Sequence, residues 1–112
     1  MSYDYLLFIA PGPGDMSSWD AVDPAPLGTP SEVQDRISRH FPQTSWRKFG
    51  DALLGRSQLS PGGDCEFQIR PGDDGQCRWL TARRITRDEV QQVCRVLGLV
   101  AVDQQKVELI RP

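Results

Sequence analysis

The sequence has few of the residues that build metal sites and disulfide frameworks. It contains three cysteines and one histidine in 112 residues. Cys65, Cys77 and Cys94 are odd in number and have no C-x-x-C spacing, which argues against both a disulfide framework and a zinc site. We therefore expect three unpaired, reduced thiols, no metal and no cofactor.

Long apolar runs are also missing. No run approaches the roughly 18 residues that a membrane helix needs. The segment 5–10 is apolar but short, Asp4 stands where a secretory signal would carry basic residues, and Pro11 follows it. We expect a soluble, cytoplasmic protein that does not bind membranes.

Basic residues are absent from the first 30 positions, which hold Asp4, Asp15, Asp20 and Asp23. The net charge of the whole chain is −2. A weakly acidic total disfavours nonspecific binding to nucleic acid or to an anionic membrane surface. We therefore expect neither as a partner.

The length of 112 residues predicts a single domain, 1–112. Its first strand is expected over 3–10, and because this strand is apolar on both faces it should lie inside a sheet. Prolines and glycines then recur from position 11 to position 29. They predict a long, acidic, irregular loop over 11–29.

Two helices have strong start signals. Thr29–Glu32 and Thr86–Glu89 both have the capping-box pattern, in which a threonine and a glutamate three residues later satisfy each other's backbone amides. The first helix is expected to end at about Phe41, before a proline, and the second at Gly98.

The segment 43–64 has a weaker pattern. Trp46, Phe49 and Leu53 fit one face of a short helix that is closed by Gly55. An irregular or short-helix insertion is therefore expected here. A turn should follow at 60–63, which reads Ser-Pro-Gly-Gly.

Two further strands, 65–70 and 76–83, are expected to form a hairpin. A three-residue loop at 73–75 would pair Ile69 with Trp79 and would bury Trp79 under the helices. A two-residue turn is the alternative, and it would place Trp79 on the solvent face beside Arg70. After the second helix, 99–102 is expected to be a strand, and 106–110 either continues it or folds back on it.

The expected order is strand, helix, strand, strand, helix, strand. This order predicts an α+β protein of the ferredoxin-like βαββαβ type, a two-layer sandwich with two helices on one face of a four-stranded antiparallel sheet. A different α+β sandwich is the alternative, because 43–64 and the C-terminal residues are extra to that topology.

We find no catalytic motif. His40 stands at the end of an amphipathic helix, where a packing role is more common than that of a general base, and the loop serines have no G-x-S-x-G context. The Gly-Pro-Gly at 12–14 follows a strand, but no lysine follows it as in a phosphate-binding loop. We therefore predict no catalytic, cofactor-binding or metal-binding residues.

The candidate partner-binding residues are Asp15, Trp19, Asp20 and Asp23. A tryptophan among carboxylates in a long loop is typical of a binding hot spot for a basic protein partner. The alternative is that Trp19 folds back over the sheet edge. A second charged group, Arg78, Arg83, Arg84 and Arg87, is expected to be a solvated, salt-bridged face.

Three blocks, MSYDYLLF at 1–8, WRKFG at 46–50 and LGLVAVDQQ at 97–105, together resemble small bacterial proteins of uncharacterised function. Some of those are similar to immunity proteins, which neutralise toxins used between competing bacteria. The resemblance implies a non-enzymatic, cytoplasmic protein-binding module with a toxin as its partner, and it assigns a role to no residue.

Two other functions stay open from the sequence. The chain could be a metabolite-binding or simple acid/base enzyme domain of ferredoxin-like fold, with His40 and the acids of 43–64 around a pocket. It could also be a structural homodimer that associates through sheet edges or sheet faces.

Overall fold

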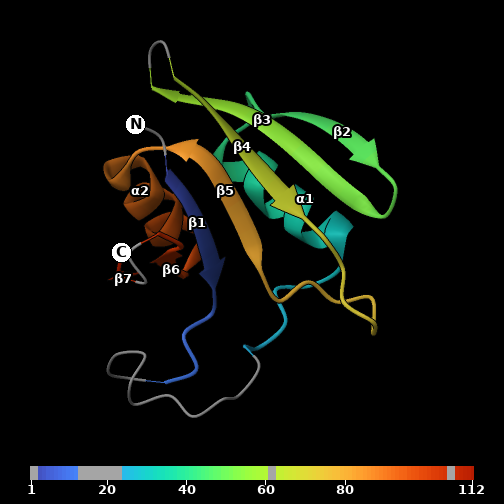
Figure 1. The fold of residues 1–112 in the computed structure, drawn as a ribbon. Helices are drawn as coiled ribbons and strands as arrows, with labels where there is room; N and C mark the ends of the chain where they lie inside the picture. Colours follow the sequence, from blue (N-terminus) through green and yellow to red (C-terminus); the bar gives the residue numbers. More distant parts are fainter. Residues whose placement is uncertain (1–2, 13–23, 61–62, 106–107) are drawn as a thin grey trace.

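The computed structural model describes residues 3–12, 24–60, 63–105 and 108–112 (Figure 1). Within them, seven strands form one antiparallel sheet in the order β2-β3-β4-β5-β1-β6-β7. The elements in chain order are β1 Tyr3–Phe8, α1 Pro30–His40, β2 Ser45–Phe49, β3 Ala52–Ser60, β4 Gly63–Ile69, β5 Leu80–Ile85, α2 Arg87–Leu97, β6 Val100–Asp103 and β7 Glu108–Ile110. Both helices lie behind the sheet in Figure 1, with α1 against β3 and β4 and α2 against β5 and β6.

The prediction of a ferredoxin-like βαββαβ fold with a four-stranded sheet is wrong. The segment 43–64 forms no helix but two strands, β2 and β3, which extend the sheet on one side. At the other side β7 pairs with β6, so the C-terminal residues fold back. In the described part of the chain, the architecture is therefore a seven-stranded antiparallel sheet with two helices.

The β2–β3 hairpin depends on a tight turn at Gly50. Phe49 pairs with Ala52, so only Gly50 and Asp51 connect the strands. Gly50 has φ +63°, a left-handed conformation that glycine adopts at the first central position of a two-residue hairpin turn. The helical spacing of the three apolar residues in this segment is coincidental, because Phe49 points to the opposite side of the sheet from the other two.

Both helices begin and end where the sequence predicts. In α1, the Thr29 hydroxyl accepts a hydrogen bond from the Glu32 amide at 3.3 Å, and the Glu32 carboxylate accepts one from the Thr29 amide at 3.0 Å. Thr86 and Glu89 make the same pair of contacts at the start of α2. Gly98 ends α2 in the left-handed conformation, with φ 71° and ψ 38°.

The predicted register between β4 and β5 is wrong by one residue. Ile69 pairs with Leu80 and not with Trp79, so Leu80 is buried in the core. The three-residue turn itself is present, because the Gly75 amide donates to the Gly72 carbonyl at 3.0 Å and Gly75 has φ +79°. The pairing changes beyond this turn.

The cause of the register shift is that Cys77 forms its backbone hydrogen bonds with the segment at Leu27 and Gly28 and not with β4. The Cys77 amide donates to the Gly28 carbonyl at 2.7 Å, and its carbonyl accepts from the Leu27 amide at 2.6 Å. Because Cys77 bonds to this distant segment, the chain between the turn and β5 leaves the hairpin ladder. Trp79 then lies on the face away from the helices, beside Arg70.

The core lies between the sheet and the helices. β1 runs between β5 and β6, which confirms the prediction of an inner strand. The largest fully buried side chains are Tyr5, Phe67, Leu7, Ile37, Ile69, Leu80, Ile85, Ile110, Val90 and Val93, together with Cys65 and Cys77.

Trp46 closes one side of this core. Its ring lies across Gly55, where an added Cβ would meet the Trp46 ring at 2.6 Å. Its indole N–H donates to the Ser38 hydroxyl of α1 at 2.8 Å. Gly55 is therefore required for the close approach of Trp46 and not, as predicted, for ending a helix.

Candidate functional site

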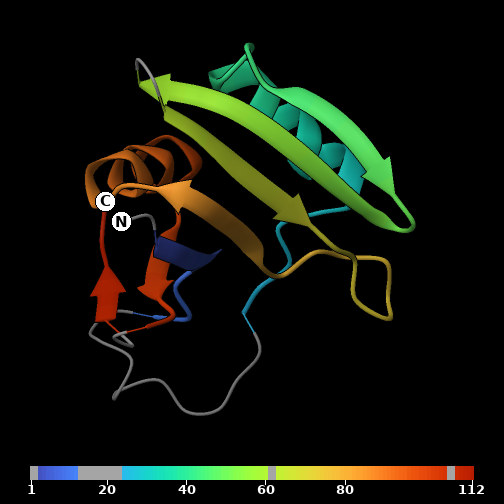
Figure 2. The same ribbon diagram turned by 45° about the horizontal axis from the view of Figure 1, so that its top comes forward.

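The second face of the sheet carries no described helix (Figure 2). Over β2 to β5 its side chains follow the strand register, with Arg47 beside Leu54, Leu54 beside Gln68, and Gln68 beside Thr81. The next row places Glu66 between Arg56 and Arg83. We call this surface the open face, and its members are Arg47, Phe49, Leu54, Arg56, Glu66, Gln68, Arg70, Trp79, Thr81 and Arg83.

A third row on the open face contains its exposed aromatic side chains. Phe49 is 68% exposed and Trp79 is 41% exposed. Phe49 pairs with Ala52, and the β3–β4 register continued by one residue beyond Ile69 places Arg70 beside Ala52. Arg70 and Trp79 both line one depression of this face. Phe49, Arg70 and Trp79 form what we call the Phe49–Trp79 row.

Two depressions hollow the open face. The larger, about 320 Å³, is lined mainly by Gln68, Arg70, Gln76, Arg78, Trp79 and Thr81. The smaller, about 210 Å³, is lined by Arg47, Leu54, Arg56 and Glu66 together with Ser45, Trp46 and Gly55. The larger one combines an indole ring, two amide side chains and a hydroxyl with guanidinium groups.

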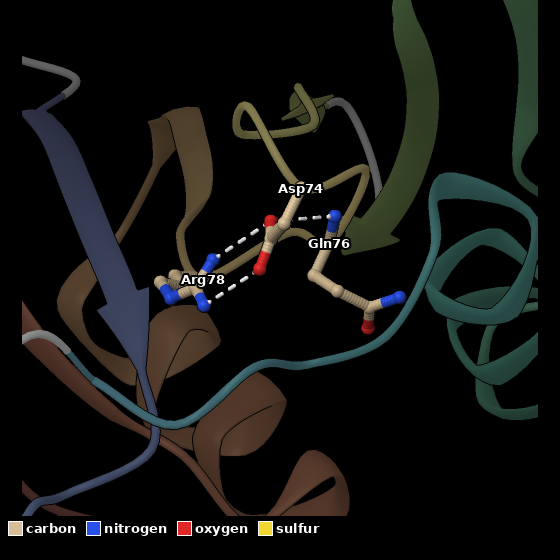
Figure 3. A network of polar contacts seen from close by, with 3 residues as sticks. All are labelled: Asp74, Gln76 and Arg78. Carbon is tan, nitrogen blue, oxygen red and sulfur yellow. Dashed lines mark hydrogen bonds and ion pairs between the residues drawn. The ribbon is translucent and has the colours of Figure 1, made fainter.

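The loop that borders the larger depression is held by Asp74 (Figure 3). Its two carboxylate oxygens accept hydrogen bonds from the two terminal nitrogens of Arg78, at 3.1 and 2.9 Å. The carboxylate also accepts from the Gln76 amide at 3.1 Å. The hydrogen bonds from Arg78, followed by the one from Gln76, lower the pKa of Asp74 to about 2. Arg78 is therefore already engaged by a carboxylate of its own loop.

The arginines of the open face differ from Arg78 in their ion pairing with the described part of the chain. Among the described residues, Arg47, Arg56, Arg70 and Arg83 form no ion pair, whereas Arg87 pairs with Glu108 at 2.9 Å. Glu66 is the carboxylate within the face, Asp64 lies two residues before it on β4, and Asp4 of β1 stands opposite Arg83 and Arg84, where the β1–β5 register shifts. The open face therefore carries an excess of positive charge.

The predicted salt-bridged arginine face is split by the structure. Arg78 and Arg87 form ion pairs, and Arg83 lies on the open face without one among the described residues. Arg84 has φ 55° at the point where the β1–β5 register shifts, so it is the extra residue of a β-bulge.

The predicted partner-binding residues Asp15, Trp19, Asp20 and Asp23 all lie outside the described residues. Their role therefore stays a prediction. The described end of the same loop is fixed at Leu27 and Gly28 by Cys77.

The alternative enzyme site requires His40 and an acid at one cavity. Asp51 lines a cavity of about 650 Å³ together with Pro30 and Ser31, at the start of α1. His40 is exposed in the last turn of α1, about 15 Å further along the helix axis at 1.5 Å per residue. The structure thus does not bring these two side chains together.

All three cysteines are free and buried, as predicted for unpaired thiols. Burial raises the pKa of Cys65 and of Cys94 to about 12, and it also raises the pKa of Cys77. These thiols stay protonated near neutral pH and are poor nucleophiles. In the described part of the chain, no group of three His, Cys, Asp or Glu side chains could hold a metal ion.

Comparison with protein-family models, with curated proteins and with solved structures gave no match. Neither described helix is long and apolar enough to cross a membrane.

Proposed function

We propose that this chain is a non-enzymatic, cytoplasmic protein-binding module that docks an acidic partner protein on its open face. The observation that carries the proposal is the set of four open-face arginines, Arg47, Arg56, Arg70 and Arg83, that have no ion-pair partner among the described residues. Arginine and tryptophan are the side chains most often found at interface hot spots.

A protein fits this surface better than a nucleic acid does. Single-stranded nucleic acid is bound in a continuous positive groove with several stacking aromatics. Here Glu66 interrupts the arginines in register, and the whole chain has a net charge of −2. Discrete carboxylates of a protein partner can pair with Arg56 and Arg83 on either side of Glu66.

The sequence resemblance to immunity proteins adds a toxin as the candidate partner. An immunity protein acts by occluding a surface, which requires a rigid face and no chemistry. The loop residues Asp15, Trp19, Asp20 and Asp23 remain a separate candidate surface, which would favour a basic partner.

The test compares two triple variants as baits in affinity capture from the source organism, with quantitative mass spectrometry. One replaces Arg47, Arg56 and Arg83 by glutamine. The control replaces Arg39, Arg95 and Arg111 by glutamine, and these three arginines are exposed and lie outside the open face. Both variants lose three positive charges. A difference in capture between them therefore depends on where the arginines lie and not on the net charge.

We expect the wild type and the control to retain an acidic protein that the open-face variant loses. The purified pair should then show about a tenfold weaker Kd for the open-face variant, from three charge pairs at about 0.5 kcal/mol each. Equal capture by all three baits, or no capture above an unrelated bait, would show that the open face is not the binding surface.

A further inference from the structure

We infer that the partner contacts the Phe49–Trp79 row with a short extended segment in which an acidic side chain lies between two apolar side chains. The inference rests on the proposed function and names the chemistry of the contact. It follows from the order of side chains in that row, where an arginine stands between two exposed aromatic rings.

The spacing of the row suits such a segment. Phe49 is on β2 and Trp79 immediately precedes β5, three strands away in the sheet order. Neighbouring strands are about 4.8 Å apart, so the backbones at these two positions are about 14 Å apart. An extended chain covers this span in about four residues, and residues i, i+2 and i+4 of that chain point to the same side.

Two arginines, Arg70 and Arg78, line the larger depression, and Arg70 is the one that is available to an anion. Both terminal nitrogens of Arg78 donate to Asp74. Arg70 forms no ion pair with any described residue. A carboxylate at the middle position of the segment could therefore form a bidentate pair with Arg70.

Trp79 is held in place before binding. Its ring packs edge-on against Phe8, with the ring centroids 5.2 Å apart and an interplanar angle of 62°. Gln76 and Arg78, which bond to Asp74, line the larger depression together with Trp79. A fixed aromatic anchor lowers the entropy lost on binding, and Gln68 and Thr81 supply polar groups for the backbone of the segment.

The direct test is a nuclear magnetic resonance titration of the ¹⁵N-labelled protein. The probe is the peptide acetyl-Ser-Leu-Ser-Glu-Ser-Leu-Ser-amide, with Glu→Gln and Leu→Ser peptides as matched controls. We expect the Arg70 Nε–H and the Trp79 indole N–H signals to shift at about millimolar peptide. Either change to the peptide should weaken binding at least about fivefold.

Protein variants locate the interaction. In Arg70→Gln the preference for the glutamate peptide over the glutamine peptide should disappear, whereas Arg95→Gln should keep it. Equal binding of the glutamate and glutamine peptides to the wild type would overturn the inference. So would the absence of shifts at Arg70 and Trp79, or tighter binding of a short oligothymidylate at the same signals.

The result separates this inference from the proposed function. If the glutamate peptide does not bind while the Arg47, Arg56 and Arg83 variant still loses its partner, the open face binds the partner by another contact. In that case only the inferred extended segment is wrong. If the peptides bind as expected but that variant retains its partner, the row is a peptide site and the wider open face is not the interface.

Discussion

At the scale of single residues, the neighbours Trp79 and Leu80 exchange the roles that the sequence pattern predicts. Leu80 is fully buried, while Trp79 is 41% exposed and packs on Phe8. We expect Leu80→Ala to lower the free energy of unfolding by about 2 to 5 kcal/mol. Trp79→Ala should lower it by only about 1 kcal/mol, because an aromatic pair and partial burial are lost.

Urea denaturation of the two variants checks this order. The burial of Trp79 predicted from a regular three-residue hairpin would instead give Trp79→Ala a loss of about 3 to 5 kcal/mol. A Trp79→Ala variant less stable than Leu80→Ala would therefore contradict the observed register.

The Asp74–Arg78 pair makes a prediction about pH. The pKa of Asp74 is lowered from 3.8 to about 2, chiefly by Arg78. A carboxyl whose pKa is lower in the folded state stabilises that state above its ordinary pKa, and the contribution is lost as the pH falls toward 2. We expect Arg78→Gln to move the pKa of Asp74 back toward 3.8.

The measurement is a titration of the Asp74 side-chain carboxyl carbon by nuclear magnetic resonance, in the wild type and in Arg78→Gln. The Gln76 amide still donates to Asp74 in the variant, so the pKa should remain slightly low. An unchanged pKa would mean that the two side chains are not paired in solution.

At the scale of secondary-structure elements, the turn at Gly50 decides whether β2 joins the sheet. Gly50 has φ +63°, and an added Cβ would meet no atom within 4 Å. Gly50→Ala should therefore destabilise the protein by about 1 to 2 kcal/mol through backbone strain alone. Hydrogen exchange should show faster exchange of the amides that join β2 to β3, with little change between β1 and β6.

Gly12→Ala is the matched control for this variant. Gly12 also has no atom within 4 Å of an added Cβ, and it has no left-handed φ. It should leave both stability and exchange unchanged. Equal effects of the two substitutions would contradict a strained turn at Gly50.

The elements that could be predicted from the sequence are those with local signals. Both helices start at a capping box, and they stop before Phe41 and Gly98. The hydrogen bonds of these caps join residues that are three or four positions apart, so a short stretch of sequence is enough to predict them. The prediction for the segment 43–64 is wrong because its apolar residues match a helical period, whereas the turn at Gly50 and Asp51 makes it a hairpin.

The β4–β5 register could not be predicted from local sequence. It is set by two backbone hydrogen bonds, one from the Cys77 amide to the Gly28 carbonyl and one from the Leu27 amide to the Cys77 carbonyl, and these partners are about fifty residues apart in the chain. A one-residue shift moves a side chain to the other face of a sheet. The hydrogen bonds of Cys77 therefore also determine that Trp79 lies on the open face and Leu80 in the core. Trp79 and Arg70 were adjacent only in the alternative reading of the turn, and Arg47 and Arg56 were assigned to no surface at all.

At the scale of the whole molecule, the distribution of charge distinguishes the two candidate surfaces. The first 30 residues contain acids and no base, whereas four arginines of the open face form no ion pair with any residue that the structure describes. Replacing Asp15, Asp20 and Asp23 by asparagine changes the net charge from −2 to +1. Long-range attraction between charges acts mainly on the association rate.

The sign of the effect identifies the partner's charge. With an acidic partner on the open face, the asparagine variant should associate faster than the wild type by about two- to fivefold at low salt, and added salt should remove the difference. With a basic partner on the loop, the same variant should associate more slowly, and adding Trp19→Ala should also speed dissociation. Stopped-flow measurement of the association rate at two salt concentrations decides between them, because the two surfaces predict changes of opposite sign.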